Sequence, residues 1–260
     1  MKITVLGARG SVPVEGKRFL EFGGATSCVL VETEDQAVFL DAGSGIVNTP
    51  DIGSKSISIL LTHPHLDHLL GMPFFPYLAR KRNIDFYCEK RFGLNAKEQL
   101  GSVFAEPLWP VRADDYAAEI NYRDIADSQF AVGAVMIDCM DSVHPGGGTV
   151  YKLTFNGRSM VYATDYEYTD EKYEELVSFA KGTDLLMIDA MYTDEEASSR
   201  IGYGHSSISQ ALKISKECGA VNVRFVHHDP YHDDEFINKL EASIDEKNIR
   251  FARKDEVIVL

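Results

Sequence analysis

The sequence feature that most constrains this chain is the segment His-Pro-His-Leu-Asp-His at residues 63–68. It follows the apolar run Ile-Ser-Ile-Leu-Leu at residues 57–61, whose composition predicts a buried strand. The next three residues, Leu-Leu-Gly at 69–71, predict one helical turn that ends at the glycine. Four side chains able to bind a metal ion therefore lie within six residues, at the end of a strand.

The backbone expected in this segment divides the four side chains into two pairs. In extended backbone, residues two apart point to the same side, so His63 and His65 can bind one ion together. A helical turn after them would direct Asp67 and His68 elsewhere, toward a second ion. Imidazole suits zinc, and manganese or iron when oxygen ligands are added. Three scattered surface histidines and a capping aspartate would be the alternative, but three of only eight histidines are gathered here.

Length and composition set the class of protein. The chain has 260 residues and is 45% hydrophobic, which is enough for a sizeable core in one large or two small domains. No apolar run approaches the roughly 20 residues of a membrane helix, and the first apolar run is too short for a signal peptide. The four cysteines form no Cys-x-x-Cys pair, so we expect reduced thiols. We expect a cytoplasmic protein without membrane association.

The net charge of −14 argues against nucleic acid as a partner, because a polyanion would be repelled on average. The basic cluster at residues 80–82 is short and is typical of a solvated helix end. A small-molecule substrate is therefore the expectation. The oligomeric state stays open, a homodimer included.

Polar side chains suited to metal or proton chemistry recur where predicted strands end. Sheets whose strand ends converge on one rim build binding sites in this way. The residues in question are Asp41, His63, Asp165, Asp189 and His227. For Asp41 two roles are open: a hydrogen bond to the metal-binding loop, or the capping of a turn.

The rest of the chain is a mixture of strands and helices. Asn156-Gly157 predicts a hairpin turn between strands at residues 150–155 and 158–163. Helical patterns are expected in four segments, at residues 95–105, 170–181, 206–218 and 233–245. Residues 72–127 are expected to form a cap or substrate region over the site.

Two ions would need more ligands than one loop provides. His144 precedes a glycine run and is a natural third imidazole for the first ion. Asp165 has two oxygens and could bridge both ions, and His227 could complete the second. A bridged pair roughly 3.5–4 Å apart would acidify a shared water.

This set of residues resembles the metallo-β-lactamase superfamily over nearly the whole chain, from the Leu-Asp-Ala-Gly step at Asp41 to His227. The resemblance implies an α/β (α+β) fold, an αββα sandwich of two mixed β-sheets flanked by helices, as a single domain over residues 1–260. It implies two divalent metal ions. One metal ion would take His63, His65 and His144, the other Asp67, His68 and His227, and Asp165 would bridge.

The bridging residue and three later segments indicate the branch. The lactamases proper use a cysteine where this chain has Asp165, which leaves hydroxyacylglutathione hydrolases and phosphodiesterases. Residues 162–165, 189–192 and 204–207 resemble steps of the phosphodiesterase branch, which includes tRNA 3′-end-processing endonucleases. The resemblance implies a pair between Asp189 and His205, in which His205 protonates the leaving group.

Three points stay open within this resemblance. The endonucleases usually carry a glutamate where this chain has the shorter Asp189. His205 could instead cap the helix that follows it. His228 neighbours His227, and the spacing His-x-x-Pro favours His227 as the ligand, which leaves His228 and His232 to face the substrate or to be ordinary polar surface.

The sequence therefore predicts a dinuclear metal-dependent hydrolase, a phosphodiesterase acting on a small phosphodiester, cyclic ones included. Its catalytic residues would be Asp67, Asp189 and His205. The alternative is a carboxylic ester or thioester hydrolase of the hydroxyacylglutathione-hydrolase type. A di-iron redox relative is less favoured, because such proteins usually carry a flavin domain, for which 260 residues leave no room. A non-catalytic binding protein with a degenerate site is also less favoured, because no ligand position is missing from this sequence. Zinc, manganese and iron all fit the ligands.

Overall fold

The computed structural model describes residues 1–260, which form fourteen β-strands, five α-helices and five short 3₁₀ helices. The strands are β1 (Lys2–Gly7), β2 (Cys28–Glu32), β3 (Gln36–Leu40), β4 (Ser56–Leu60), β5 (Asn83–Glu89), β6 (Glu119–Ile125), β7 (Gln129–Val132), β8 (Val135–Ser142), β9 (Gly148–Phe155), β10 (Arg158–Ala163), β11 (Leu185–Asp189), β12 (Asn222–Val226), β13 (Ile249–Phe251) and β14 (Val257–Val259). The α-helices are α1 (Ala96–Gly101), α2 (Tyr173–Phe179), α3 (Asp194–Ser198), α4 (Ile208–Cys218) and α5 (Asp234–Ala242). The 3₁₀ helices are Ser44–Asn48, Leu66–His68, Met72–Phe74, Ser102–Phe104 and Ala113–Asp115.

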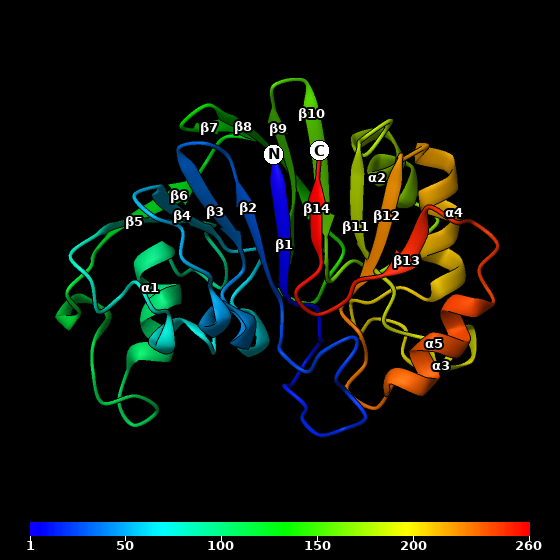
Figure 1. Ribbon diagram of the computed structural model, residues 1–260, viewed down its shortest axis with the longest axis horizontal. Helices are drawn as coiled ribbons and strands as arrows, with labels where there is room; N and C mark the ends of the chain where they lie inside the picture. The colour runs from blue at the N-terminus through cyan, green and yellow to red at the C-terminus, as the bar shows by residue number, and fades with distance from the viewer.

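The strands form two seven-stranded sheets of matching design (Figure 1). The first has the order β14-β1-β2-β3-β4-β5-β6 and the second β13-β12-β11-β10-β9-β8-β7. Each sheet contains three consecutive antiparallel pairings and three consecutive parallel ones. Strand β14 pairs with β1, so the two ends of the chain lie side by side at the top of Figure 1. Both sheets are therefore mixed, as predicted.

Central strands are buried on both faces, which explains their nearly continuous apolar sequences. In β2 the side chains alternate: Val29 and Val31 belong to the core between the sheets, together with Tyr151 of the second sheet. Cys28 and Leu30 belong to the core on the outer face of the first sheet. Because each fully buried aliphatic side chain contributes about 1.5–3 kcal/mol, this double burial holds the strands in one register.

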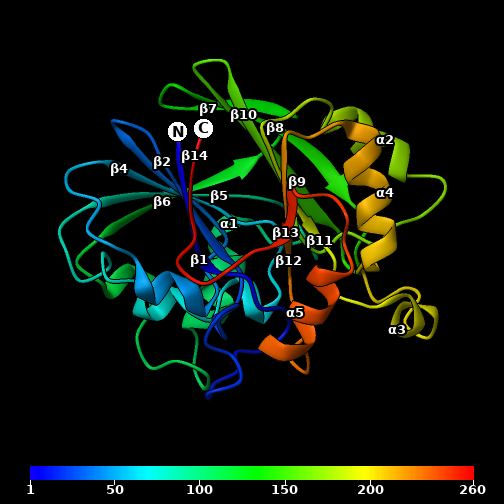
Figure 2. The ribbon, with the colours of Figure 1, turned by 45° about the vertical axis from the view of Figure 1, so that its right-hand side comes forward.

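Helices cover the outer face of each sheet. Helix α1 and the 3₁₀ segments pack on the first sheet, whereas α2, α4 and α5 pack on the second (Figure 2). Helix α4 begins with a capping box at Ser207 and ends at Gly219, whose φ of 67° is the usual left-handed C-terminal cap. The αββα sandwich expected from the sequence is confirmed.

Several local predictions hold and others need correction. The hairpin turn is confirmed, since Asn156 and Gly157 have the positive φ angles of a type I′ turn. Helix α2 begins three residues later than predicted and ends two earlier, and the first predicted helix continues as a 3₁₀ turn after Gly101. The predicted helical turn at residues 69–71 is wrong, because the chain forms a 3₁₀ turn at Leu66–His68 instead.

Residues 72–127 contain two strands that the sequence analysis did not assign. Strands β5 and β6 extend the first sheet by parallel pairing to β4 and to each other. The buried residues of β5, Ile84, Phe86 and Cys88, alternate with partly exposed ones, and this period of two was the missed signal. The role of the region as a cap stays a prediction.

No helix of the structure combines the length and the apolar character that crossing a membrane requires.

Candidate metal centre

The metal-capable side chains predicted from the sequence gather at one edge of the sandwich. The donor atoms of the predicted ligands form two groups, within each of which all atoms lie within 4.8 Å of one another. The groups are His63, His65 and His144, and Asp67, His68, Asp165 and His227. Two further such groups contain His205, one with His144 and Asp165 and one with Asp189 and His227. Strands β3 and β4 of the first sheet and β10, β11 and β12 of the second end at this edge (Figure 1). All seven predicted ligand residues therefore meet.

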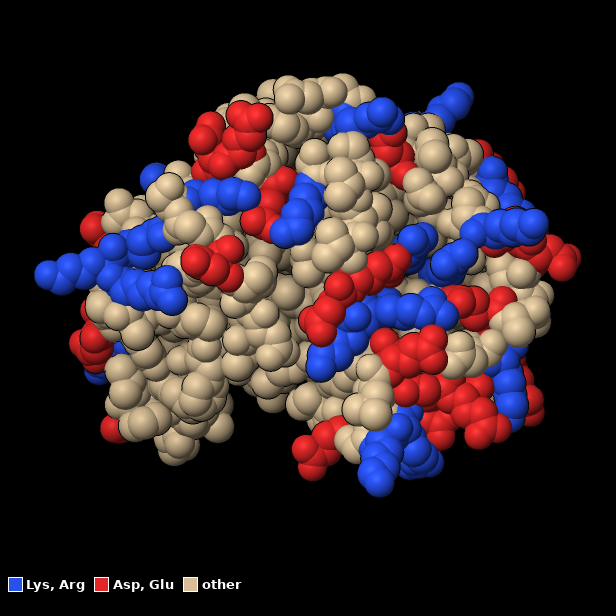
Figure 3. Space-filling model, in the orientation of Figure 1, with Lys and Arg blue, Asp and Glu red and all other residues tan.

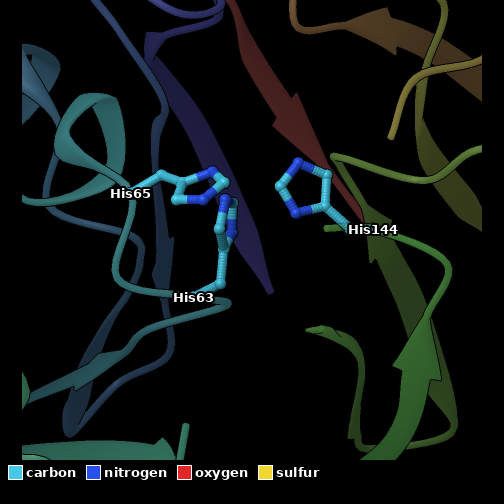
Figure 4. Close-up of side chains that lie close together, drawn as sticks. All are labelled: His63, His65 and His144. Atoms are coloured by element: carbon cyan, nitrogen blue, oxygen red, sulfur yellow. The ribbon is translucent and has the colours of Figure 1, made fainter. Parts of the chain in front are cut away.

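The first group joins the two sheets. His63 and His65 come from the loop after β4, and His144 comes from the loop between β8 and β9. Figure 4 shows the three rings turned toward one another. The ring centroids of His63 and His144 are 4.5 Å apart, and those of His65 and His144 are 4.9 Å apart. His63 and His65, two residues apart, therefore point to the same side, as predicted for extended backbone.

Asp165 lies between the two groups and presents one oxygen to each. Its Oδ1 atom is 3.7 Å from Nε2 of His63 and 3.6 Å from Nε2 of His144. Its Oδ2 atom is 3.2 Å from Nε2 of His68 and 3.1 Å from Nδ1 of His227. A single carboxylate thus faces both groups, which is the arrangement that a bridging ligand requires.

Asp41 hydrogen-bonds Thr62 and His68, at either end of the loop with the metal-capable residues, which is the first of the two roles that the sequence left open for it. The fully buried carboxylate lies 2.8 Å from Nδ1 of His68 and accepts hydrogen bonds from the backbone and the hydroxyl of Thr62 at 2.8 and 3.0 Å. Because Nδ1 of His68 is engaged in this way, its Nε2 atom faces the cluster. A carboxylate behind a ligand histidine fixes the ring and raises its basicity.

The electrostatics of the cluster fit divalent cations. Burial lowers the pKa of His63, and it lowers the pKa of His144 to about 4, so both rings are neutral at pH 7 and able to bind metal. Nε2 of His63 and Nε2 of His68 are buried, and although oxygens of Asp165 lie 3.7 and 3.2 Å away, neither nitrogen forms a hydrogen bond with them. An orphaned buried nitrogen is costly unless something else occupies it. The donor set and these orphaned atoms both fit metal ions.

The second group attracts positive charge strongly. Burial would lower the pKa of His68, but the carboxylates of Asp67, Asp165 and Asp41 outweigh burial and raise it well above the usual value. Burial would also favour the neutral acid of Asp165, but His227 and His68 outweigh it and hold the pKa of that carboxyl well below its usual range. The carboxylates therefore stay ionised, and a divalent ion would supply the positive charge that they attract.

Three residues of the centre have a left-handed backbone. Asp41, Asp165 and His227 have φ angles of 64°, 52° and 63°, and each lies just beyond the end of a strand. Aspartate and histidine tolerate this region better than most residues, but it remains uncommon outside glycine. Strain of this kind concentrates at functional sites, because it turns a side chain out of the alternation of the strand.

The structure separates His227 from its neighbour. The ring of His228 points into the core, where Nε2 lies 2.9 Å from the carbonyl oxygen of Ala252 and the ring packs edge-on against Phe22. Burial lowers the pKa of His228 to about 3. His232 lies outside the cluster, with Nε2 3.0 Å from Oε1 of Glu196. Of these histidines only His227 joins the metal-capable group.

Asp189 and His205 form the predicted pair. Nδ1 of His205 is 2.8 Å from Oδ2 of the fully buried Asp189. The same carboxylate accepts hydrogen bonds from the backbone of Met191, Ser206 and Asp165. Although aspartate is shorter than glutamate, it reaches the histidine, and the stacked rings of His205 and His227 have centroids 4.7 Å apart.

The loop after β1 supports the centre in a way that the sequence analysis missed. The backbone N–H of Ser11 donates to Oδ2 of Asp67 at 2.9 Å, and Gly10 lies against the ring of His227. The side chain of Arg9 is fully buried and donates to the backbone carbonyls of Gly23, Asp229 and His232. The glycine-rich composition of residues 7–11 was the available signal.

The family model described as "Beta-lactamase superfamily domain" matches residues 38–228. The chain therefore belongs to the β-lactamase superfamily, which confirms the predicted family, and it is a hydrolase of that superfamily. The metal-capable His and Asp residues described above fit divalent ions as the superfamily fold implies.

Particular relatives agree with the predicted branch. A ribonuclease Z of Natronomonas pharaonis is 22% identical over 279 residues, which cover 87% of this chain and 86% of that protein. An octanoyltransferase of Porphyromonas gingivalis is 25% identical over 236 residues, 82% of this chain. This chain spans only 45% of the length of that second protein.

Solved structures share the fold over their full length. The metallo-β-lactamase fold protein YhfI from Bacillus subtilis has a TM-score of 0.75 at 19% identity, covering 99% of this chain and 98% of that one. A diphosphatase from the PhnP family has a TM-score of 0.71 at 19% identity, covering 100% and 97%. At these identities the likeness concerns the fold alone.

Proposed function

We propose that this protein is a dinuclear metal-dependent phosphodiesterase that acts on a small phosphodiester. The observation that carries the proposal is the position of Asp165, whose two oxygens face two separate groups of imidazoles at 3.1–3.7 Å. His63, His65 and His144 would hold one ion, and Asp67, His68 and His227 the other. Zinc suits five imidazole ligands best, and manganese or iron suits the added carboxylates. When bound, two divalent ions supply an acidified water and neutralise charge on phosphoryl oxygens.

The pair of His205 and Asp189 would supply the proton for the leaving oxygen. Because Nδ1 of His205 is engaged by Asp189, Nε2 is the atom left to donate a proton to the leaving oxygen. Burial lowers the pKa of His205, but the charge and hydrogen bond of Asp189 outweigh burial and raise the pKa to about 9. The ring therefore carries its proton at neutral pH. An alkoxide is a poor leaving group without such a proton.

Phosphorus as the reacting centre is also supported by the relatives. A ribonuclease cleaves bonds to phosphorus, and the ribonuclease Z of Natronomonas pharaonis matches 87% of this chain. The expectation that nucleic acid is not a substrate stays a prediction. It rests on the charge of −14 and on the interspersed acidic and basic residues of the face drawn in Figure 3.

The test starts with the purified protein reconstituted with zinc or with manganese. We expect about two ions per chain and turnover of a linear or cyclic alkyl phosphodiester. The panel includes a tRNA precursor and S-lactoylglutathione, so that a nuclease or a thioester hydrolase would be recognised. Thioester turnover in the absence of diester turnover would contradict the proposal.

A variant at His205 then tests the acid. His205→Ala is expected to slow an alkyl diester by 10²–10⁴-fold, the usual contribution of general acid catalysis, and to slow bis(4-nitrophenyl) phosphate far less. His232→Ala is the matched control, because His232 is also buried and also paired with a carboxylate, but lies outside the metal-capable groups. Equal slowing of both diesters would exclude the acid role.

A further inference from the structure

A cavity of about 330 Å³ opens beside His205. It is lined by His205, by the loop after α3 and by residues 167–171. Because His205 is the proposed proton donor, the group that leaves from phosphorus would be the part of the substrate nearest this cavity. The residues that line the cavity would therefore meet the leaving group.

Arg200 is the one basic side chain other than His205 among the residues that line this cavity. Its guanidinium carbon lies 4.7 Å from the centroid of the Tyr192 ring, and this ring is edge-on to His205 with centroids 5.7 Å apart. The tyrosine therefore connects the arginine with the proposed acid. About a third of the Arg200 side chain is exposed, so its exposed N–H groups are within reach of a ligand.

The hydrogen-bonding capacity of Arg200 is unused. Its Nη1 atom is buried and has no hydrogen-bond partner. This atom forms only a long ion pair, with Oε1 of Glu196 at 3.9 Å. The carboxylate of Glu196 is already hydrogen-bonded to His232 and to the N-cap residue Thr193. An arginine with unfilled donors beside a cavity is suited to a planar anion, which it binds through two parallel hydrogen bonds.

The acidic residues that line the cavity do not remove the preference of Arg200 for an anion. Glu167 accepts hydrogen bonds from the backbone of Gly202 at 2.6 Å and of Gly204 at 2.8 Å, so its charge is used to hold the loop. Asp170 accepts a hydrogen bond from the hydroxyl of Tyr168. Glu171 is the third acidic residue of the lining, and none of the three carboxylates forms an ion pair with the guanidinium, which leaves Arg200 as the anion-binding group.

We infer that Arg200 determines specificity by binding a second anionic group, a carboxylate or a phosphate monoester, on the leaving alcohol of the substrate. The inference rests on the proposed function and narrows its substrate class to diesters whose leaving group is itself an anion. Arg200 does not act in the cleavage step. It holds the leaving group so that the departing oxygen faces His205.

The test compares two aryl diesters that differ only in charge. Methyl 4-carboxyphenyl phosphate carries a carboxylate on its leaving group, and methyl 4-carbamoylphenyl phosphate carries the neutral amide. With the metal-loaded enzyme we expect a higher kcat/KM for the carboxylate. Arg200→Gln should remove this preference, roughly a tenfold or larger loss on the carboxylate alone, expressed in KM more than in kcat. Arg200→Lys should keep part of it.

A matched control distinguishes a specific role from a structural one. Arg80 also lies over an aromatic ring, 4.5 Å from the centroid of Tyr77, but is exposed and outside the cavity. Arg80→Gln should leave the preference unchanged. If Arg200→Gln slows both diesters equally, the arginine only supports Tyr192 and the inference is overturned.

Binding of the products separates this inference from the proposed function. If the wild-type enzyme cleaves neither diester, the phosphodiesterase proposal fails, whereas the role of Arg200 is still decided by ligand-observed NMR. We expect wild type to bind 4-hydroxybenzoate in preference to 4-hydroxybenzamide, and Arg200→Gln to bind both equally. Equal binding of the two products by wild type overturns the inference.

Discussion

The carboxylate of Asp189 holds Nδ1 of His205 at 2.8 Å while accepting the backbone N–H of Asp165, the residue that faces both imidazole groups. One buried acid thus aligns the proton donor with the metal-capable centre. Its position at the end of β11, between β10 and β12, makes this possible. A substitution of Asp189 is therefore expected to affect both the orientation of His205 and the position of Asp165 in the metal-capable centre.

Asp189→Asn should lower the pKa of His205, because the variant removes the negative charge that stabilises the imidazolium. In wild type the proton is lost as pH rises toward about 9, so turnover of an alkyl diester should fall there. In Asp189→Asn this fall should move to lower pH by about one unit or more. The measurement is the pH profile of kcat for an alkyl diester, with an activated aryl diester as the reference. An unchanged profile would show that Asp189 does not set the protonation of His205.

Asp41→Asn should weaken metal binding without unfolding the protein. Nδ1 of His68 loses its charged partner, and outer carboxylates of this kind typically contribute 10–100-fold to metal affinity. The measurement is zinc affinity by competition with a chelator. Asp184→Asn is the control, since that carboxylate also binds a backbone N–H, that of Ser159, but is remote from the cluster. Equal affinities in the two variants would contradict a role for Asp41.

Gly204→Ala should disrupt the first group of histidines. Gly204 has a φ of 90°, and a Cβ at this position would overlap the ring of His144. The left-handed backbone and the overlap together should cost about 2–4 kcal/mol in the free energy of unfolding. Gly202→Ala is the matched control, because its φ of 83° is similar but its Cβ would meet open space. Urea denaturation and metal content report the two effects, and equal behaviour of both variants would exclude the overlap as the cause.

Glu32→Gln should destabilise the protein at neutral pH and lose this effect in acid. Burial would raise the pKa of Glu32, but its hydrogen bonds with Lys2 and Lys55, at 2.7 and 2.9 Å, outweigh burial and lower the pKa. A carboxyl whose pKa is lower in the folded state stabilises the fold above its unfolded pKa, and this contribution is lost as pH falls through the folded pKa.

At pH 7 we expect the free energy of unfolding to be about 1 kcal/mol lower in Glu32→Gln than in wild type. This is less than the usual value for charged hydrogen bonds because both lysines are partly exposed. The difference should shrink below about pH 4. Urea denaturation of chelator-treated protein measures it without a contribution from metal release. A difference that is the same at pH 7 and pH 3.5 would show that the ion pairs are not its source.

The sequence by itself determined the features that depend on local spacing. The alternation of His63 and His65 on extended backbone required both to point to one side. The Asn156-Gly157 turn required a hairpin, since few other residue pairs accept two positive φ angles. The apolar runs predicted strands buried on both faces, and the resemblance to the metallo-β-lactamase superfamily implied their arrangement as two packed sheets with helices outside.

Only the tertiary structure decided which atoms face one another across the two sheets. The choice between His227 and His228 depends on a left-handed backbone at one residue, which no spacing of residues reveals. The division of the Asp165 oxygens between two groups, and the free donors of Arg200 beside His205, depend on contacts between segments far apart in the chain. Spacing along a chain governs the direction of neighbouring side chains, whereas distances between remote ones follow from the packing of the whole core.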